Sequence, residues 1–182
     1  NNLISGVGHL LNADWVCVWK NDGAAYSVSS QWHAKGDFVD TYVLDTLNNG
    51  CNAWTNQLRA GKMVVINDLE TEKSHLFAAL IKPSLTLGLR SLLVVPVLRD
   101  GDLWGVLTVA QLCRKRVWTM MEIGWLKTTA DAIMNANLRI KMEKQLSESN
   151  RILAEYDDSM QEILAVQESL AQISMQYAVS DS

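Results

Sequence analysis

The amino-acid sequence lacks the features on which several large classes of protein depend. It has three cysteines and no Cys-x-x-Cys pair, so we expect neither a disulfide framework nor a zinc site. No apolar run reaches the roughly 18 residues that a membrane-spanning helix needs, and no signal peptide is recognisable. The 16 basic residues are scattered among 20 acidic ones, which leaves no basic stripe for nucleic acid. We therefore expect a cytoplasmic protein without a membrane span and without a nucleic-acid partner.

Proline and glycine, which interrupt helices, are absent from the last part of the chain, since neither occurs after Gly124. The hydrophobic period changes from about two to about 3.6 residues at Thr119. Thr119 and Glu122 also have the spacing of a capping box. One helix is therefore predicted from Thr119 to about Val179, about 90 Å long at 1.5 Å per residue. A helix of that length extends beyond one small domain.

Apolar side chains repeat along this predicted helix at alternating intervals of three and four residues, the spacing of a coiled coil. A parallel two-stranded coiled coil is predicted, and polar residues in its seam, such as Asn137, Ser149 and Gln167, indicate a modest stability that suits switching. Fraying or back-folding of the end of the helix stays open as the alternative, because an isolated helix is marginal in water. The predicted dimer seam consists of Ile133, Ile140, Leu146, Leu153, Tyr156, Met160, Ile163 and Leu170.

The first part of the chain contains short β-favouring runs separated by turn residues, which predict an antiparallel sheet. The clearest turn is Asp100-Gly101, a pair typical of the type I′ hairpin. Its two flanking strands are apolar at successive positions, so both faces should be covered, and Gly105 indicates a close approach of another segment. Helices are predicted before the first strand and, in broken segments, between Gly36 and Gly61. The predicted strands cover residues 15–19, 26–32, 63–67, 92–98 and 103–109.

Three segments resemble characteristic parts of GAF domains. Residues 88–109 read GLRSLLVVPVLRDGDLWGVLTV, which resembles the central hairpin of the family, and residues 116–122 read RVWTMME, which resembles the entry into its last helix. Residues 58–68 contain the strand predicted at 63–67 and end at Asp68, and they resemble the corresponding segment of the family. The resemblance extends over about residues 3–140. It implies an α+β fold with an antiparallel sheet of five to six strands, helices on one face and a small-molecule pocket under loops on the other.

The Leu-Trp-Gly-Val and Arg-Val-Trp segments are most similar to phytochrome and cyanobacteriochrome GAF domains. The resemblance implies that a bilin would be attached through a Cys-His pair upstream of the Val-Val-Pro strand, and the matching positions here are Ala79 and Leu80. Covalent bilin binding is not expected, because the thiol nucleophile is missing. The Asn-Lys-x-Phe-Asp-Glu signature of the cyclic-nucleotide subgroup also has no counterpart. We therefore expect no cofactor.

Few residues offer catalytic or binding chemistry. None of the three histidines is paired with Cys, Asp or Glu at nucleophile or metal-ligand spacing, so neither a catalytic residue nor a metal site is expected. Five residues are candidates for contacts with a ligand. Each also has a structural interpretation, the tryptophans as core, the histidine as a helix cap or surface residue, and the charged residues as an ion pair. The candidate ligand-binding residues are Trp32, Trp54, Asp68, His75 and Arg90.

The resemblance implies a bacterial signalling protein, such as a sensor histidine kinase or another two-component protein. We expect residues 1–140 to form the GAF sensor domain and residues 141–182 to form a coiled-coil signalling helix that leads to an output domain in a longer chain. A homodimer through the N- and C-terminal helices would relay the binding of an unknown small molecule or of a partner. The relay requires that the ligand bind two helix arrangements with different affinities.

Three alternative functions stay open. A ligand-free GAF domain would serve only for dimerisation, with its pocket filled by its own tryptophans. A redox sensor would use Cys113, because the adjacent Arg114 and Lys115 favour a thiolate. A GAF-fold methionine sulfoxide reductase would need several cysteines around one pocket, and the spacing of Cys17, Cys51 and Cys113 does not match that requirement. We therefore expect that the chain is not an enzyme.

Overall fold

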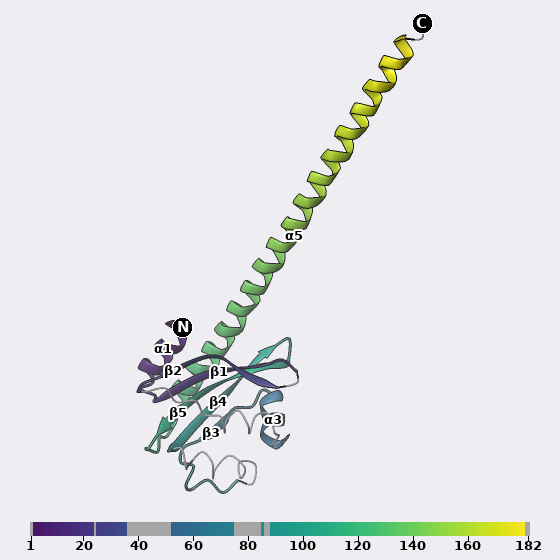
Figure 1. Cartoon of the computed structure of the whole chain (residues 1–182). Helices are drawn as coiled ribbons and strands as arrows, with labels where there is room; N and C mark the ends of the chain where they lie inside the picture. Colours follow the sequence, from purple (N-terminus) through teal and green to yellow (C-terminus); the bar gives the residue numbers. More distant parts are fainter. Residues whose placement is uncertain (1, 24, 36–51, 75–84, 86–87, 181–182) are drawn as a thin grey trace. The chain divides into compact units, whose positions relative to one another are not determined.

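The computed structural model describes residues 2–23, 25–35, 52–74, 85 and 88–180. Its centre is a five-stranded antiparallel sheet with the strand order β2-β1-β5-β4-β3, as Figure 1 shows. This sheet confirms the predicted α+β fold with five to six strands. The strands are β1 (Trp15–Asn21), β2 (Tyr26–His33), β3 (Val64–Ile66), β4 (Leu89–Arg99) and β5 (Asp102–Leu112).

The central hairpin of β4 and β5 forms as its turn residues predict. Asp100 and Gly101 have φ angles of 53° and 90°, and positive values at both positions are what a type I′ turn requires. Apart from the residues next to the turn, β4 and β5 are buried or half-buried throughout, so both of their faces are covered. Gly105 of β5 lies against β1. A Cβ atom at Gly105 would be 2.2 Å from the carbonyl oxygen of Trp19, which confirms the predicted close approach.

The two faces of the sheet carry different layers. One face forms the core cluster, in which Trp19 of β1 packs with Leu58 of α3 (Asn52–Arg59). Side chains alternate along a strand, so Val16 of β1 points to the opposite face, where it is also buried. The helix α1 (Asn2–Leu10) packs against β1 and β2. Figure 1 shows α1 and α3 on opposite sides of the sheet. The strands β1, β4 and β5 are largely buried, whereas most of β2 is exposed or half-buried.

The long helix α5 runs from Met120 to Ser180 and contains 61 residues, which confirms the predicted C-terminal helix. Its capping box is present. The Thr119 N–H donates to the Glu122 carboxylate at 2.7 Å, and the Glu122 N–H donates to the Thr119 hydroxyl at 3.3 Å. Two N–H groups at the start of the helix therefore have side-chain acceptors.

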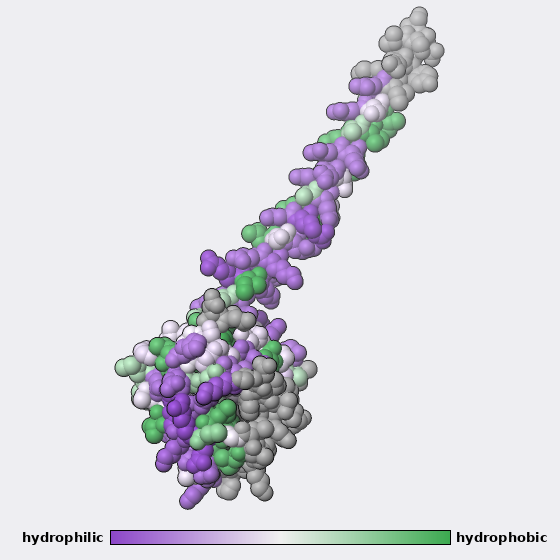
Figure 2. Space-filling model, turned by 60° about the vertical axis from the view of Figure 1, so that its left-hand side comes forward, coloured by the Kyte–Doolittle hydropathy of each residue, from purple (hydrophilic) through white to green (hydrophobic). Residues whose placement is uncertain are grey.

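The chain divides into two compact units, residues Asn1–Asn135 and Ala136–Ser182, and α5 contributes to both. In the first unit α5 buries Leu126 and Ile133. The assignment of Ile133 to the dimer seam is wrong, because its side chain is only 7% exposed and packs within this unit. In the second unit every residue from 139 to 172 is exposed. Figure 2 shows apolar side chains, drawn in green, among the polar ones along this helix.

Part of the predicted helical structure lies outside the described residues. Of the helical segments expected between Gly36 and Gly61, α3 is the part that the structure describes. Within the described part of the chain, no helix combines the length and the apolar character that a membrane span requires.

Candidate functional site

An ion-pair cluster of Asp68, Glu70 and Arg90 lies at the sheet edge formed by β3. The Leu69 N–H donates to the Arg90 carbonyl at 2.8 Å, which places the segment after β3 beside the start of β4. The Arg90 guanidinium donates to the Asp68 carboxylate at 2.8 Å and to the Glu70 carboxylate at 2.6 Å. The hydrogen bond from Arg90 lowers the pKa of Asp68, and the same bond raises the pKa of Arg90. Two of the candidate ligand-binding residues therefore form the ion pair that their structural interpretation predicts.

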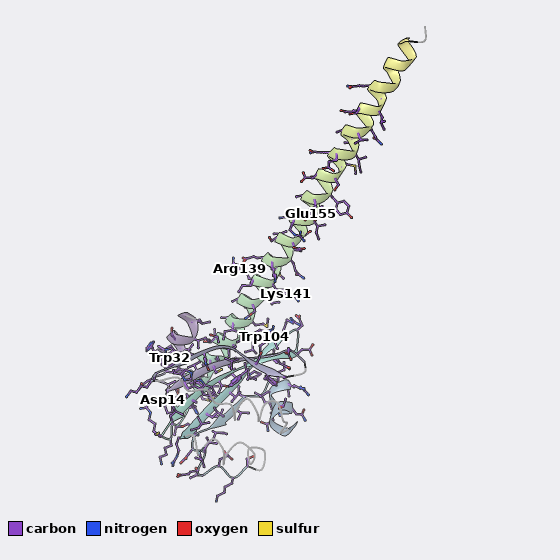
Figure 3. The ribbon with its side chains drawn as sticks, in the orientation of Figure 1. Asp14, Trp32, Trp104, Arg139, Lys141 and Glu155 are labelled. Atoms are coloured by element: carbon purple, nitrogen blue, oxygen red, sulfur yellow. The ribbon has the colours of Figure 1, made fainter. Side chains whose placement is uncertain are left out.

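Trp32, another candidate, lies away from this ion-pair cluster. It belongs to β2, at the opposite edge of the sheet, and it pairs with Val16, whose side chain faces α1. The Trp32 ring packs edge-on against His9 of α1, with 4.9 Å between ring centroids. Trp32 is labelled in Figure 3. The structure therefore does not bring Trp32 together with the charged candidates Asp68 and Arg90. The side chain of Trp54 and the whole of His75 lie outside the described residues.

The sheet face that carries α3 holds a cluster of aromatic side chains that was not among the candidate residues. Trp15 packs edge-on against Trp19 at 5.9 Å and stacks on His33 at 6.2 Å, both measured between ring centroids. The Trp19 indole N–H donates to the Thr108 hydroxyl at 3.0 Å. Burial raises the pKa of the nearby Tyr26 phenol. Residues 15–19 of β1 are β-favouring and apolar at every position, so the sequence does not reveal which face of the strand is directed toward α3.

Arg116 connects several elements just before α5 begins. Its guanidinium donates to the Leu11 carbonyl at 2.5 Å and to the Gln111 side-chain oxygen at 2.9 Å, and it forms an ion pair with Glu122. It also lies over the Trp118 ring, 4.6 Å from the centroid. Burial acts to raise the pKa of Glu122, but hydrogen bonds from the helix start and from Arg116 lower it overall. Glu122 therefore both caps α5 and anchors Arg116.

The end of β3 holds the same segment from the other side. The Asn67 side-chain oxygen accepts a hydrogen bond from the Trp118 N–H at 3.1 Å, and the Asn67 carbonyl accepts one from the Arg116 N–H at 3.0 Å. The Trp118 indole N–H donates to the Ile66 carbonyl at 3.3 Å. These three hydrogen bonds fix the segment just before α5 to Ile66 and Asn67 at the end of β3.

Comparison with known proteins identifies the family. The model of the GAF domain family matches residues 1–137. The chain belongs to the GAF family. No curated protein matches this GAF domain.

Solved structures share the fold of this GAF domain. The crystal structure of the cyanobacteriochrome TePixJ GAF domain aligns with a TM-score of 0.66 at 23% identity, and the match covers 78% of this chain and 88% of that chain. A domain of a two-component sensor histidine kinase protein from Sinorhizobium meliloti 1021 aligns with a TM-score of 0.64 at 14% identity and covers 80% and 93%. A far-red absorbing dark-state structure with bound biliverdin IXa aligns with a TM-score of 0.57 at 18% identity and covers 74% and 86%.

The thiols of this GAF domain do not fit the attachment of a bilin at the position that the resemblance implies. Ala79 and Leu80 stand there, and neither carries a thiol or an imidazole. Of the cysteines that the structure describes, Cys17 is buried in the core cluster and Cys113 is exposed after β5. Among the described residues there is also no group of three or more His, Cys, Asp or Glu side chains that could hold a metal ion.

Proposed function

We propose that this GAF domain is a non-enzymatic sensory module of a bacterial two-component signalling protein. It relays the binding of a small molecule or a partner through a homodimer of α5 to an output domain in a longer chain. One observation supports the proposal above all others. One face of the first turns of α5, with Leu126, Ala130 and Ile133, is buried in the globular unit, and the same 61-residue helix continues with every residue from 139 to 172 exposed. A continuous helix is stiff, so a rotation or tilt at one end reaches the other.

The exposed part of α5 is expected to require a second copy of the chain. An isolated helix is marginal in water, and the apolar side chains of this one are open to solvent. Burying each of them against a partner would contribute about 1.5–3 kcal/mol. The remaining seam residues have exposed fractions between 54% and 71%; they are Ile140, Leu146, Leu153, Tyr156, Met160, Ile163 and Leu170.

The opposite face of the same helix is charged. Arg151 forms ion pairs with Glu148 at 2.7 Å and with Glu155 at 2.6 Å. In the heptad that Leu153 and Tyr156 define, these charged residues occupy the outward positions c and f. Arg139, Lys141 and Glu155 mark this part of α5 in Figure 3. The distribution of charge leaves the seam as the face that suits a second helix.

A second apolar stripe overlaps the dimer seam. Ile152 and Val166 are 43% and 59% exposed, and they continue the intervals of three and four residues on the other side of Tyr156, Ile163 and Leu170. Two copies of α5 can therefore pair through either stripe after each helix rotates about its axis. A ligand that favours one of two such arrangements shifts their populations, which is the requirement for a relay.

The second candidate function is a ligand-free dimerisation module. It is favoured by the packing of Trp15, Trp19 and Tyr26 into the core cluster, because this alternative expects the tryptophans of the chain to fill the space of a pocket. Native mass spectrometry and an absorption spectrum of the purified chain distinguish the two. A dimer that retains a small molecule supports the sensor, and an empty dimer supports the dimerisation module. A visible absorption band would contradict the expectation that no bilin is bound.

The dimer itself is tested with a matched pair of variants. Ile163→Asn changes a residue that both stripes share, whereas Ala165→Asn introduces the same side chain at an outward position. The first variant removes two isoleucines from each dimer and should weaken dimerisation by at least about a hundredfold. The second should leave it unchanged. Sedimentation equilibrium measures both dissociation constants, and circular dichroism checks that the globular unit is folded. Equal constants for the two variants, or a wild-type chain that is monomeric at high concentration, would refute the proposal.

A further inference from the structure

A basic hollow lies beside Arg116, apart from the ion-pair cluster and the aromatic face. Its volume is about 210 Å³. It opens where the chain leaves β5 and before α5 begins, next to the turn that follows α1. The hollow is lined by Asn12, Gln111, Arg114, Lys115 and Arg116.

The charge of this hollow is strongly unbalanced. Three of its five lining residues are cationic and none is a carboxylate. Arg116 is neutralised by Glu122, but among the described residues neither Arg114 nor Lys115 takes part in an ion pair within 4 Å. Lys115 does act on the more distant Asp68, whose pKa it helps to lower after the larger effect of Arg90. Two cations therefore remain available at the rim.

The polar groups around the hollow hold its two arginines, Arg114 and Arg116, in place. The Arg114 guanidinium donates to the Asn12 carbonyl at 3.1 Å, which orients it and leaves its other N–H groups for further acceptors. Gln111 is 0% exposed, and its amide donates to the Asp14 carboxylate at 2.6 Å while its oxygen accepts from Arg116. Asp14 also accepts the Leu112 N–H at 2.8 Å, so this carboxylate is turned toward the protein and is not among the lining residues.

We propose that the basic hollow binds a phosphate-type oxyanion, either free or as the phosphate group of a small metabolite. An arginine fork beside a lysine ammonium matches the charge and the several acceptor oxygens of phosphate. Size restricts the ligand further, because pockets for whole drug-sized molecules measure about 300–1,000 Å³ and this one is smaller. The site lies next to the Arg116–Glu122 ion pair, and Glu122 also caps α5. A bound anion therefore lies close to the residues that fix the start of this helix. The inference is independent of the proposed function.

The test is a titration of the whole 182-residue chain with inorganic phosphate, followed by amide NMR at constant ionic strength, which chloride maintains. A parallel titration with glycerol 3-phosphate distinguishes free from esterified phosphate. The variants are Arg114→Gln and Lys115→Gln, both at exposed positions, and the control is Lys141→Gln, which removes one positive charge from the exposed part of α5.

We expect saturable shifts that centre on residues 111–116, with a dissociation constant on the order of 1 mM. Arg114→Gln and Lys115→Gln should each weaken binding by about tenfold, and Lys141→Gln should leave it unchanged. Tighter binding of glycerol 3-phosphate would assign the site to esterified phosphate, and equal binding would assign it to the free ion. Shifts that do not saturate, or the same dissociation constant in all three variants, would overturn the proposal.

Discussion

Replacement of Gly105 by alanine tests the packing of β5 against β1. An added Cβ would lie 2.2 Å from the Trp19 carbonyl oxygen, 3.2 Å from its carbonyl carbon and 3.4 Å from the Lys20 Cα. All three atoms belong to the main chain of β1, so no side-chain rotation relieves the overlap and the strands must separate. Overpacking of this kind costs about 1–3 kcal/mol, and weakening of the Trp19–Thr108 hydrogen bond adds about 1 kcal/mol. We expect Gly105→Ala to lower the free energy of unfolding by about 2–4 kcal/mol.

The measurement is urea unfolding followed by tryptophan fluorescence, because Trp15 and Trp19 are buried in the core cluster. Gly124→Ala is the control, since apart from the adjacent residues and backbone of α5 itself no atom lies within 4 Å of a Cβ at that position. It should raise the stability by up to about 1 kcal/mol, the difference in helix propensity between the two residues. Both variants are compared at one protein concentration, because dimerisation would otherwise contribute to stability. A Gly105→Ala variant as stable as the wild type would refute the geometry of the β1–β5 contact.

Two further predictions concern other contacts. Gly8→Ala should destabilise the protein by about 1–3 kcal/mol, since its Cβ would lie 2.1 Å from the Trp32 ring, whereas Gly6→Ala, with open space around it, should be neutral or stabilising in thermal unfolding. A Gly8→Ala variant with the same unfolding temperature as Gly6→Ala would contradict the contact. The hydrogen bond from Arg90 lowers the pKa of Asp68, so the stability that this pair contributes is present at neutral pH and is lost as the pH falls below 3.8, the ordinary value. Asp68→Asn should therefore flatten the acid limb of unfolding temperature against pH, and an unchanged slope would show that the pair does not stabilise the fold.

The local elements of this fold were predictable because short-range chemistry determines them. Asp100-Gly101 specifies its turn through two positive φ angles. The capping box of Thr119 and Glu122 marks the start of α5 to within one residue, since it involves only neighbouring groups. Gly105 indicated a close approach without revealing that Trp19 is the neighbour. In each case the residues that interact are few and near in sequence, or the residue type alone carries the signal.

The arrangement of the site was not predictable in the same way. Trp32 was expected in a ligand pocket, but the alternation of β2 directs it toward His9 of α1. The basic run at Arg114 to Arg116 suggested only a reactive neighbouring cysteine. Its structural role depends on Leu11 and Gln111, and Leu11 lies 105 residues away along the chain from Arg116. Contacts of that range follow from the strand order, which the sequence of one chain does not disclose.

In the proposed relay, a signal reaches α5 through the contacts that fix the start of the helix and through its buried residues Leu126 and Ile133. Asn67 accepts hydrogen bonds from the main chain of Arg116 and of Trp118, and it is the neighbour of Asp68 in the ion-pair cluster. In the proposed relay, a movement of Asp68 would displace both acceptors of Asn67. Two hydrogen bonds contribute about 1–3 kcal/mol together, which equals the coupling energy typical of allosteric proteins. In the proposed relay this junction selects between two helix arrangements only where their free energies differ by a similarly small amount, and pairing through one or the other apolar stripe of α5 is the pair of arrangements that we propose.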